Sequence, residues 1–171
     1  FDDRMIGGGK ADDLTGSASD DQLRGKKASD TLQGFAGDDY LFGGAGDDQL
    51  DGGSGSDVLQ GRGGRDLLIG ADGHDVLYGG AGADTLTGNA GQDVFVLSKG
   101  NDVVTDFNVN QDAIGIVNAL ELSIEQNGDD LLIIDRQAKV STLLLGIDRD
   151  DFLSNYPSNL QQVPVAELDV F

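Results

Sequence analysis

Residues 34–60 read GFAGDDYLF, GGAGDDQLD and GGSGSDVLQ, three consecutive blocks of nine residues with one shared pattern. The same phase runs from Gly7 to Val96 through ten blocks without an insertion or deletion. Every block has glycine first and aspartate sixth, and leucine is eighth in nine blocks, with Phe95 in the tenth. Twelve aspartates lie nine residues apart, from Asp3 to Asp102, and the period ends at Gln111. Such regularity is the signature of a repeat protein.

Each block predicts one turn and one strand. Glycine at positions 1, 2 and 4 permits positive φ, so the first six residues are expected to turn and positions 7–9 to form a very short strand. One leucine per nine residues cannot form a core alone, but stacked blocks can bury their leucines together. We therefore predict an all-β parallel β-roll, a right-handed solenoid of 18 residues per coil. Alternate blocks would lie on opposite sheets, with neighbouring strands about 4.8 Å apart.

Composition favours cations as partners. The chain of 171 residues has 31 acidic and 11 basic residues and a net charge of −20, which disfavours nucleic acid and anionic membranes. There is no cysteine, and no apolar run reaches the length of a membrane span. A Gly- and Asp-rich segment could be a disordered linker, but the strict phase of leucine against aspartate argues against that.

Stacked turns bring two aspartates to each gap, together with backbone carbonyls. All-oxygen ligation of this kind suits a hard cation, and the flexible geometry favours Ca²⁺ over Mg²⁺. The EF-hand pattern is absent because no loop has glutamate at its twelfth position. The glycine runs superficially match G-x-G-x-x-G, but they recur every nine residues without a strand–turn–helix context, which excludes a dinucleotide site.

The blocks resemble the RTX (haemolysin-type) nonapeptide G-G-x-G-x-D-x-U-x over about residues 1–105. Calcium-binding β-rolls of this type occur in serralysin-type proteases, haemolysin-type toxins, secreted lipases and the R-modules of mannuronan C5-epimerases. The resemblance implies that each ion takes the carbonyls of positions 2 and 4 and the aspartate of one turn. It also takes the carbonyls of positions 1 and 3 and the aspartate of the turn two blocks later.

Six calcium sites follow from that resemblance. They are Phe35, Gly37 and Asp39 with Gly52, Ser54 and Asp57; Gly44, Gly46 and Asp48 with Gly61, Gly63 and Asp66; Gly53, Gly55 and Asp57 with Gly70, Asp72 and Asp75; Arg62, Gly64 and Asp66 with Gly79, Ala81 and Asp84; Ala71, Gly73 and Asp75 with Gly88, Ala90 and Asp93; and Gly80, Gly82 and Asp84 with Leu97, Lys99 and Asp102.

The first three blocks depart from the pattern. Position 4 is Lys10, Ser19 and Ala28 instead of glycine, and further lysines lie in these turns. A side chain there disfavours positive φ, and a nearby ammonium group competes with Ca²⁺. Sites that use Asp12, Asp21 and Asp30 are therefore expected to be weaker or empty.

Residues 106–171 are expected to form a second region, a β-rich segment that caps the last coil of the roll. Strands are predicted within 104–117, 119–129, 130–136 and 139–146, with turns at Gly128 and Gly146. Residues 147–156 are expected to form a short helix capped by Asp148. The stretch after the repeats resembles serralysins and epimerase R-modules. The final residues 167–171, ELDVF, are similar to tails of proteins exported by type I secretion.

Three functions were weighed. The first is a calcium-binding module of a secreted, extracellular protein that folds on extracellular Ca²⁺ and supports export through type I secretion machinery. The second is a solenoid that binds a ligand: a polysaccharide could contact Arg62 and Arg65, whereas no threonine ladder supports ice binding. The third, an enzyme, is disfavoured because H-E-x-x-H and G-x-S-x-G are absent and the one histidine, His74, is expected at an exposed turn position. The chain does not begin with methionine, so any catalytic domain is expected upstream.

Overall fold

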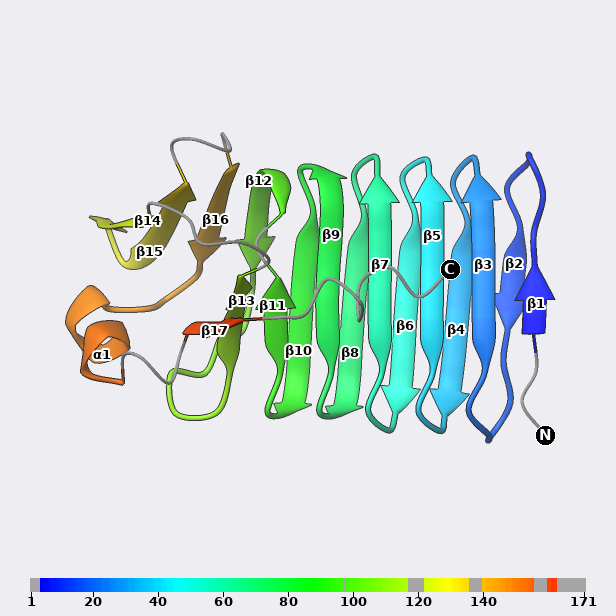
Figure 1. The fold of residues 1–171 in the computed structure, drawn as a ribbon, viewed down its shortest axis with the longest axis horizontal. Coiled ribbons are helices and arrows are strands. Elements are labelled where there is room, and N and C mark those ends of the chain that lie inside the picture. Colours follow the sequence, from blue (N-terminus) through cyan, green and yellow to red (C-terminus); the bar gives the residue numbers. More distant parts are fainter. Residues whose placement is uncertain (1–3, 97, 117–121, 136–139, 156–159, 163–171) are drawn as a thin grey trace.

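Alternate blocks of the repeat form two parallel β-sheets, whose strands follow one another along the long axis of the roll (Figure 1) and whose leucines form one shared core. The structure, a computed structural model, describes residues 4–96, 98–116, 122–135, 140–155 and 160–162. Sheet A contains β1 (Arg4–Ile6), β3 (Gln22–Lys27), β5 (Tyr40–Ala45), β7 (Val58–Gly63), β9 (Val76–Gly82), β11 (Val94–Val96), β13 (Ala113–Ile116) and β17 (Leu160–Gln162). Sheet B contains β2 (Asp13–Thr15), β4 (Thr31–Ala36), β6 (Gln49–Ser54), β8 (Leu67–Gly73), β10 (Thr85–Gly91), β12 (Lys99–Val104), β16 (Val140–Leu144), β15 (Asp130–Asp135) and β14 (Leu122–Asn127). The start of β12 also pairs with β9 of sheet A.

The strand register has the predicted spacing of 18 residues. In sheet A, Leu23 pairs with Leu41 and Leu41 with Leu59, while in sheet B Leu32 pairs with Leu50. All strand pairs within the repeat are parallel, from β1 with β3 to β10 with β12. The predicted parallel β-solenoid, in which two blocks make one coil, is therefore confirmed.

The strands are longer than predicted. β3 to β7 have six residues each, because positions 1–3 of a block continue the strand formed by positions 7–9 of the block before. Lys26, for example, pairs with Gly44 and Phe35 with Gly53, both at position 2. The prediction of a very short strand was wrong because the left-handed residue at position 2 still permits parallel pairing. The turn is correspondingly confined to positions 4–6.

The core is one double row of position-8 side chains. Leu23 to Leu86 and Phe95 are at most 1% exposed and form one cluster with Val104 and Ile114. A fully buried leucine contributes roughly 1.5–3 kcal/mol. Since each block supplies only one such residue, stability depends on stacking many coils.

The described strands after the repeat and α1 lie at the last coil, at the end of the roll opposite to β1 (Figure 1). β16 pairs in parallel with β12, and an antiparallel meander continues through β15 and β14. The rings of Phe95, Phe107 and Phe152 follow one another at 5.9 Å between centroids and close the end of the core. The predicted strands and both turns are present, and Gly128 and Gly146 both have φ of 69°.

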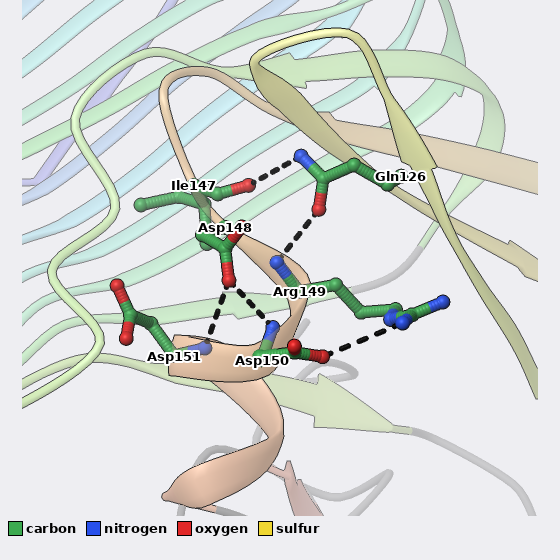
Figure 2. A network of polar contacts seen from close by, with 6 residues as sticks. All are labelled: Gln126, Ile147, Asp148, Arg149, Asp150 and Asp151. Atoms are coloured by element: carbon green, nitrogen blue, oxygen red, sulfur yellow. Dashed lines mark hydrogen bonds and ion pairs between the residues drawn. The ribbon is translucent and has the colours of Figure 1, made fainter.

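The predicted helix is α1 (Arg149–Ser154), and Asp148 is its N-cap. The Asp148 carboxylate accepts hydrogen bonds from the N–H groups of Asp150 and Asp151 at 2.8 and 3.2 Å (Figure 2). Gln126 of β14 ties the helix to the meander: its amide donates to the Ile147 carbonyl and accepts from the Arg149 N–H (Figure 2). Within the described residues, no helix has the length and apolar character needed to cross a membrane.

Candidate metal centre

The repeat aspartates form two ladders, one along each row of turns. From Asp12 to Asp84, the backbone N–H of each position-6 aspartate donates to Oδ1 of the aspartate 18 residues later, at 2.7–3.1 Å. All six aspartate pairs predicted to share an ion are joined in this way. Asp39 and Asp57 are 2.7 Å apart between N and Oδ1, and Asp84 and Asp102 are 3.1 Å apart. Each Oδ1 is thereby fixed in the gap between two coils.

Glycine at position 1 makes room for the carboxylate of its own block. A Cβ at Gly61 would overlap Asp66 Oδ2 and lie 2.7 Å from the Gly79 carbonyl oxygen. The same holds at Gly43 with Asp48 and at Gly52 with Asp57. The sequence suggested positive φ as the reason for this glycine, but the positive-φ residues lie at positions 2 and 4. Glycine is therefore needed at position 1 because the aspartate carboxylate lies too close to its Cα for a side chain to fit, which only the folded turn reveals.

Backbone carbonyls from both coils line the gap. The carbonyls of positions 2 and 4 face the next coil, because a Cβ at Gly53 would overlap the Phe35 oxygen and one at Gly55 the Gly37 oxygen. Carbonyls at position 3 face the other way: Ser54 O accepts from Gly37 N–H, and Gly63 O from Gly46 N–H, both at 2.9 Å. Those at position 1 also face back, as Gly79 O does toward Gly61. These are the four carbonyl positions that the family resemblance implied.

In eight successive blocks of the repeat, the position-6 aspartate has a buried carboxylate oxygen without a protein partner. Oδ2 has no hydrogen-bond partner in Asp30, Asp39, Asp48, Asp57, Asp66, Asp75, Asp84 and Asp93. Burial raises the pKa of Asp39, Asp57, Asp66 and Asp75 to about 7 and that of Asp48 and Asp84 to about 6, although the backbone hydrogen bond opposes the rise. Neighbouring aspartates raise these pKa values further. An unpaired buried carboxylate is costly, so each gap favours either a proton or a cation.

The donor set fits Ca²⁺. Each gap offers two carboxylates, such as those of Asp48 and Asp66, and several backbone carbonyls. Among the described residues, no group of three or more acidic or histidine side chains is placed to hold a metal ion without those carbonyls. Ca²⁺ accepts six to eight such oxygens in flexible geometry, whereas Mg²⁺ requires a near-ideal octahedron. The nitrogen and sulfur ligands that Zn²⁺ prefers are missing, because the chain has no cysteine and His74 is exposed.

The two ends of the aspartate series differ from its centre. Asp12 Oδ2 accepts from the Gly8 N–H and Asp21 Oδ2 from the Ser17 N–H, both at 2.6 Å and both within one turn. At the other end, Asp102 Oδ2 accepts from the Ser98 hydroxyl at 2.6 Å. Of the sixth predicted site, Leu97 lies outside the described residues, while Lys99 belongs to β12.

Asp30 resembles the central aspartates, because its Oδ2 has no hydrogen-bond partner. The sequence had predicted a weaker or empty site at Asp30, as at Asp12 and Asp21. In its turn Lys26 and Ala28 have φ of 87° and 74°, so positions 2 and 4 are left-handed as in the later turns. Lys10 and Ser19, at position 4 of the first two turns, are not left-handed. The Lys26 carbonyl faces Gly44 and the Ala28 carbonyl faces Gly46. Blocks three and five therefore enclose a seventh gap with the same geometry.

Sequence phasing missed one ladder member. Asp112 Oδ1 accepts from the Asp93 N–H at 3.1 Å, across 19 residues rather than 18, and Ile114 pairs with Phe95. One inserted residue moves the period from Gln111 to Asp112. The signal was visible as aspartate followed two residues later by an aliphatic residue, the spacing that each repeat shows between positions 6 and 8.

A second ladder at position 5 also escaped the sequence analysis. Asp20 Oδ1 accepts from the Asp38 N–H, and Asp38 Oδ1 from the Ser56 N–H, at 2.9 and 2.8 Å. His74 is exposed, as expected, and its Nδ1 accepts from the Gln92 N–H at 2.9 Å. These bonds join successive coils without a cation.

A family model described as RTX calcium-binding nonapeptide repeat (4 copies) matches residues 1–32, 15–50, 33–68, 51–86 and 69–104, which together exceed half of the chain. The chain belongs to the RTX calcium-binding repeat family. The RTX repeats therefore bind calcium, and the repeated aspartates described above fit that role. Among curated proteins, the comparison found no match.

Two solved structures are similar to this RTX chain. The extracellular lipase LipA from Serratia marcescens has 18% sequence identity and a TM-score of 0.50, over 94% of this chain and 40% of the lipase. The AlgE6R3 subunit of the mannuronan C5-epimerase from Azotobacter vinelandii has 22% identity and a TM-score of 0.39, over 90% of this chain and 79% of that subunit. The lipase match supports the fold alone, and this RTX chain spans less than half of the lipase's length.

Proposed function

We propose that this chain is a non-catalytic RTX module that folds when Ca²⁺ fills the gaps between its coils. The observation that carries the proposal is the series of eight buried Oδ2 atoms without a partner, from Asp30 to Asp93. Ionised carboxylates in such a column repel one another, and Arg65, a basic residue of a central turn, is exposed whereas the carboxylates are buried. Bound Ca²⁺ removes that repulsion, and its binding free energy then becomes folding free energy.

The ligands of each ion are proposed to be the six sets predicted from the family resemblance. In the second of them, for example, Gly44, Gly46 and Asp48 face Gly61, Gly63 and Asp66. We add the gap formed by Lys26, Ala28 and Asp30 with the turn of Asp48. The set that ends at Asp102 is proposed to bind most weakly, since Ser98 already satisfies one oxygen of that carboxylate.

Calcium-dependent folding supports a role in export of a larger secreted protein. At low Ca²⁺ the acidic chain stays expanded and can pass type I secretion machinery, whereas about 10⁻³ M Ca²⁺ outside the cell folds it. In this proposal residues 1–105 are the calcium roll and residues 106–171 cap it. The secretion signal proposed at residues 167–171 lies outside the described residues.

Ion counting tests the ligand assignment. Native mass spectrometry of the calcium-loaded chain is expected to find about six bound ions or more. Asp57 contributes to two gaps, so Asp57→Asn is expected to lose the ions of both, while Asp12→Asn keeps the full number. Equal losses in the two variants would contradict the assignment.

We also propose binding of an acidic polysaccharide as a second function. Its support is that Arg62, one of the two arginines predicted for this role, lies on the same face of sheet A as Arg24, Lys26 and Lys27. Affinity electrophoresis in millimolar Ca²⁺ through gels containing chondroitin sulfate, with neutral dextran as control, tests it. Retardation by the sulfated polymer alone is expected, and equal mobility in both gels would refute it.

A further inference from the structure

Basic residues are segregated between the two sheets. β3 and β7 of sheet A carry Arg24, Lys26, Lys27 and Arg62, which are half of the eight basic residues in the repeat region. In sheet B, β2, β4, β6, β8 and β10 contain no lysine or arginine, and Lys99 of β12 pairs with Ala81 of sheet A. A chain of net charge −20 thus presents one face with concentrated positive charge.

These cations surround a hollow of about 360 Å³ on sheet A. Its lining consists of Arg24, Lys26, Lys27, Phe42, Gly44 and Arg62. The Phe42 ring is only 2% exposed, and the guanidinium carbons of Arg24 and Arg62 both lie 5.7 Å from its centroid. The ring therefore holds two guanidinium groups in place through cation–π contacts. Among the described residues, the lining contains no acidic side chain, so this part of the surface favours anions.

Two of the lining residues also belong to the calcium gaps. Lys26 and Arg62 occupy position 2 with φ of 87° and 79°, a left-handed backbone that glycine adopts at Gly44 and Gly80 and that residues with a side chain rarely adopt. Their carbonyls face Gly44 and Gly80 in the next coil, while their side chains line the hollow. One left-handed residue thus directs a carbonyl toward a cation and a positive side chain toward the surface.

We propose that the hollow on sheet A binds the carboxylate or sulfate groups of an acidic polysaccharide, and that calcium occupancy controls this binding. The inference rests on the proposed calcium function, because bound Ca²⁺ would fix the backbone of Lys26 and Arg62. The cations extend from β3 across β5 to β7, about 10 Å at the usual strand spacing. One small anion cannot span that width, whereas a chain with successive anionic groups can. Nucleic acid is disfavoured because the ring at the base of the hollow is buried and cannot stack with a nucleobase.

Thermodynamic linkage makes the coupling reciprocal. If Ca²⁺ raises the affinity for the polysaccharide, the polysaccharide must raise the affinity for Ca²⁺ by the same factor. Chondroitin sulfate oligosaccharides, which carry both carboxylate and sulfate, are therefore expected to lower the calcium midpoint of folding, and neutral dextran is not.

Arg24→Gln separates the two functions. Arg24 is at position 9 of its block and belongs to none of the proposed calcium sets, so the variant is expected to fold at the same Ca²⁺ concentration as the unchanged chain. It loses a cation of the hollow, and its affinity for chondroitin sulfate is expected to fall on the order of tenfold, as for loss of a charged hydrogen bond. Arg65→Gln is the matched control: it removes an arginine that does not line the hollow, and less than a twofold change is expected.

Two titrations of the full chain decide the matter: oligosaccharide binding by calorimetry in millimolar Ca²⁺ and in chelator, and calcium-induced folding by circular dichroism. Equal loss in Arg24→Gln and Arg65→Gln would overturn the site, as would undiminished binding to a folded chain in chelator. Tighter binding of poly-glutamate than of the oligosaccharide would replace the polysaccharide by an acidic polypeptide as ligand. Failure of the folding titration alone would refute the calcium function and leave the anion site to stand on the binding data.

Discussion

The central turns and the terminal turns of the roll use the same aspartate in different ways. From Asp30 to Asp93 the Oδ2 atom has no protein partner, whereas Oδ2 of Asp12, Asp21, Asp102 and Asp112 accepts a hydrogen bond. The terminal turns thus satisfy this oxygen with their own N–H or hydroxyl groups. From this difference we expect calcium dependence to lie in the centre of the roll and its ends to close without an ion.

The largest effect expected is that of pH on the metal-free roll. The folded-state pKa values of Asp39, Asp57, Asp66 and Asp75 are raised to about 7, well above about 3.9 in the unfolded chain. A raised pKa means that the folded state binds the proton more tightly, so stability is greatest below about pH 4 and is lost as pH rises through 7. In chelator, circular dichroism is expected to show more β-structure at pH 5 than at pH 8. A metal-free roll that gains structure as pH rises would contradict the unpaired state of the central carboxylates.

Gly61→Ala is expected to have the next largest effect. The added Cβ overlaps Asp66 Oδ2 and the Gly79 carbonyl, so it displaces ligands from a central gap. Overpacking typically costs about 1–3 kcal/mol, and displaced calcium adds to that loss. Gly9→Ala, in a terminal turn with no atom within 4 Å of the new Cβ, is the control and should change the unfolding free energy by about 0.5 kcal/mol or less. Thermal unfolding in millimolar Ca²⁺ compares the two, and equal shifts would remove the distinction between centre and end.

A smaller effect is expected for Asp57→Asn, which keeps an oxygen acceptor but removes the charge that two gaps share. Its calcium midpoint should rise several-fold, since Ca²⁺ affinity follows the number of charged ligands. Asp12→Asn alters a carboxylate that its own turn satisfies, so its midpoint should match that of the unchanged chain. Calcium titrations followed by circular dichroism measure both, and a rise for Asp12→Asn as large as for Asp57→Asn would contradict the account.

The smallest effect is expected for a substitution in the third turn, at the border between the terminal and the central turns. Ala28 has φ of 74°, so Ala28→Gly relieves left-handed strain and should stabilise the loaded roll by about 1 kcal/mol. Ala45→Gly, at a position without positive φ, should instead destabilise it by about 0.5–1 kcal/mol. The change in unfolding free energy is measured by urea unfolding for both variants. Changes of opposite sign would mean that the third turn resembles the central turns, and changes of the same sign would mean that it resembles the first two turns.

Much of the fold could be predicted because the repeat leaves few alternatives. The period, the parallel pairing and the division into two sheets follow from Asp57 and its equivalents at position 6 and from Leu59 and its equivalents at position 8. The roles of position-1 glycines such as Gly61 could not be predicted, since the clash that excludes a side chain arises only in the folded turn. Asp112 was missed because one inserted residue breaks the phase.

The surface features depend on residues that are distant in sequence. Arg24 and Arg62 meet over Phe42 only because residues 18 apart become neighbours in a sheet. The position-5 ladder has the same origin: Asp38 and Ser56 are joined across one coil. The positions of the turns could be predicted from the local sequence. These contacts could not, because they depend on which residues of successive coils lie opposite each other.

The central claim is that calcium folds this roll, and a calcium titration of metal-free protein at pH 7.5, followed by far-UV circular dichroism, tests it most directly. The account predicts a steep gain of β-signal near millimolar Ca²⁺. Magnesium at the same concentration should produce no such gain, because the gaps offer carboxylates and carbonyls in flexible geometry. A spectrum already fully folded in chelator at that pH, or an equal response to magnesium, would contradict it.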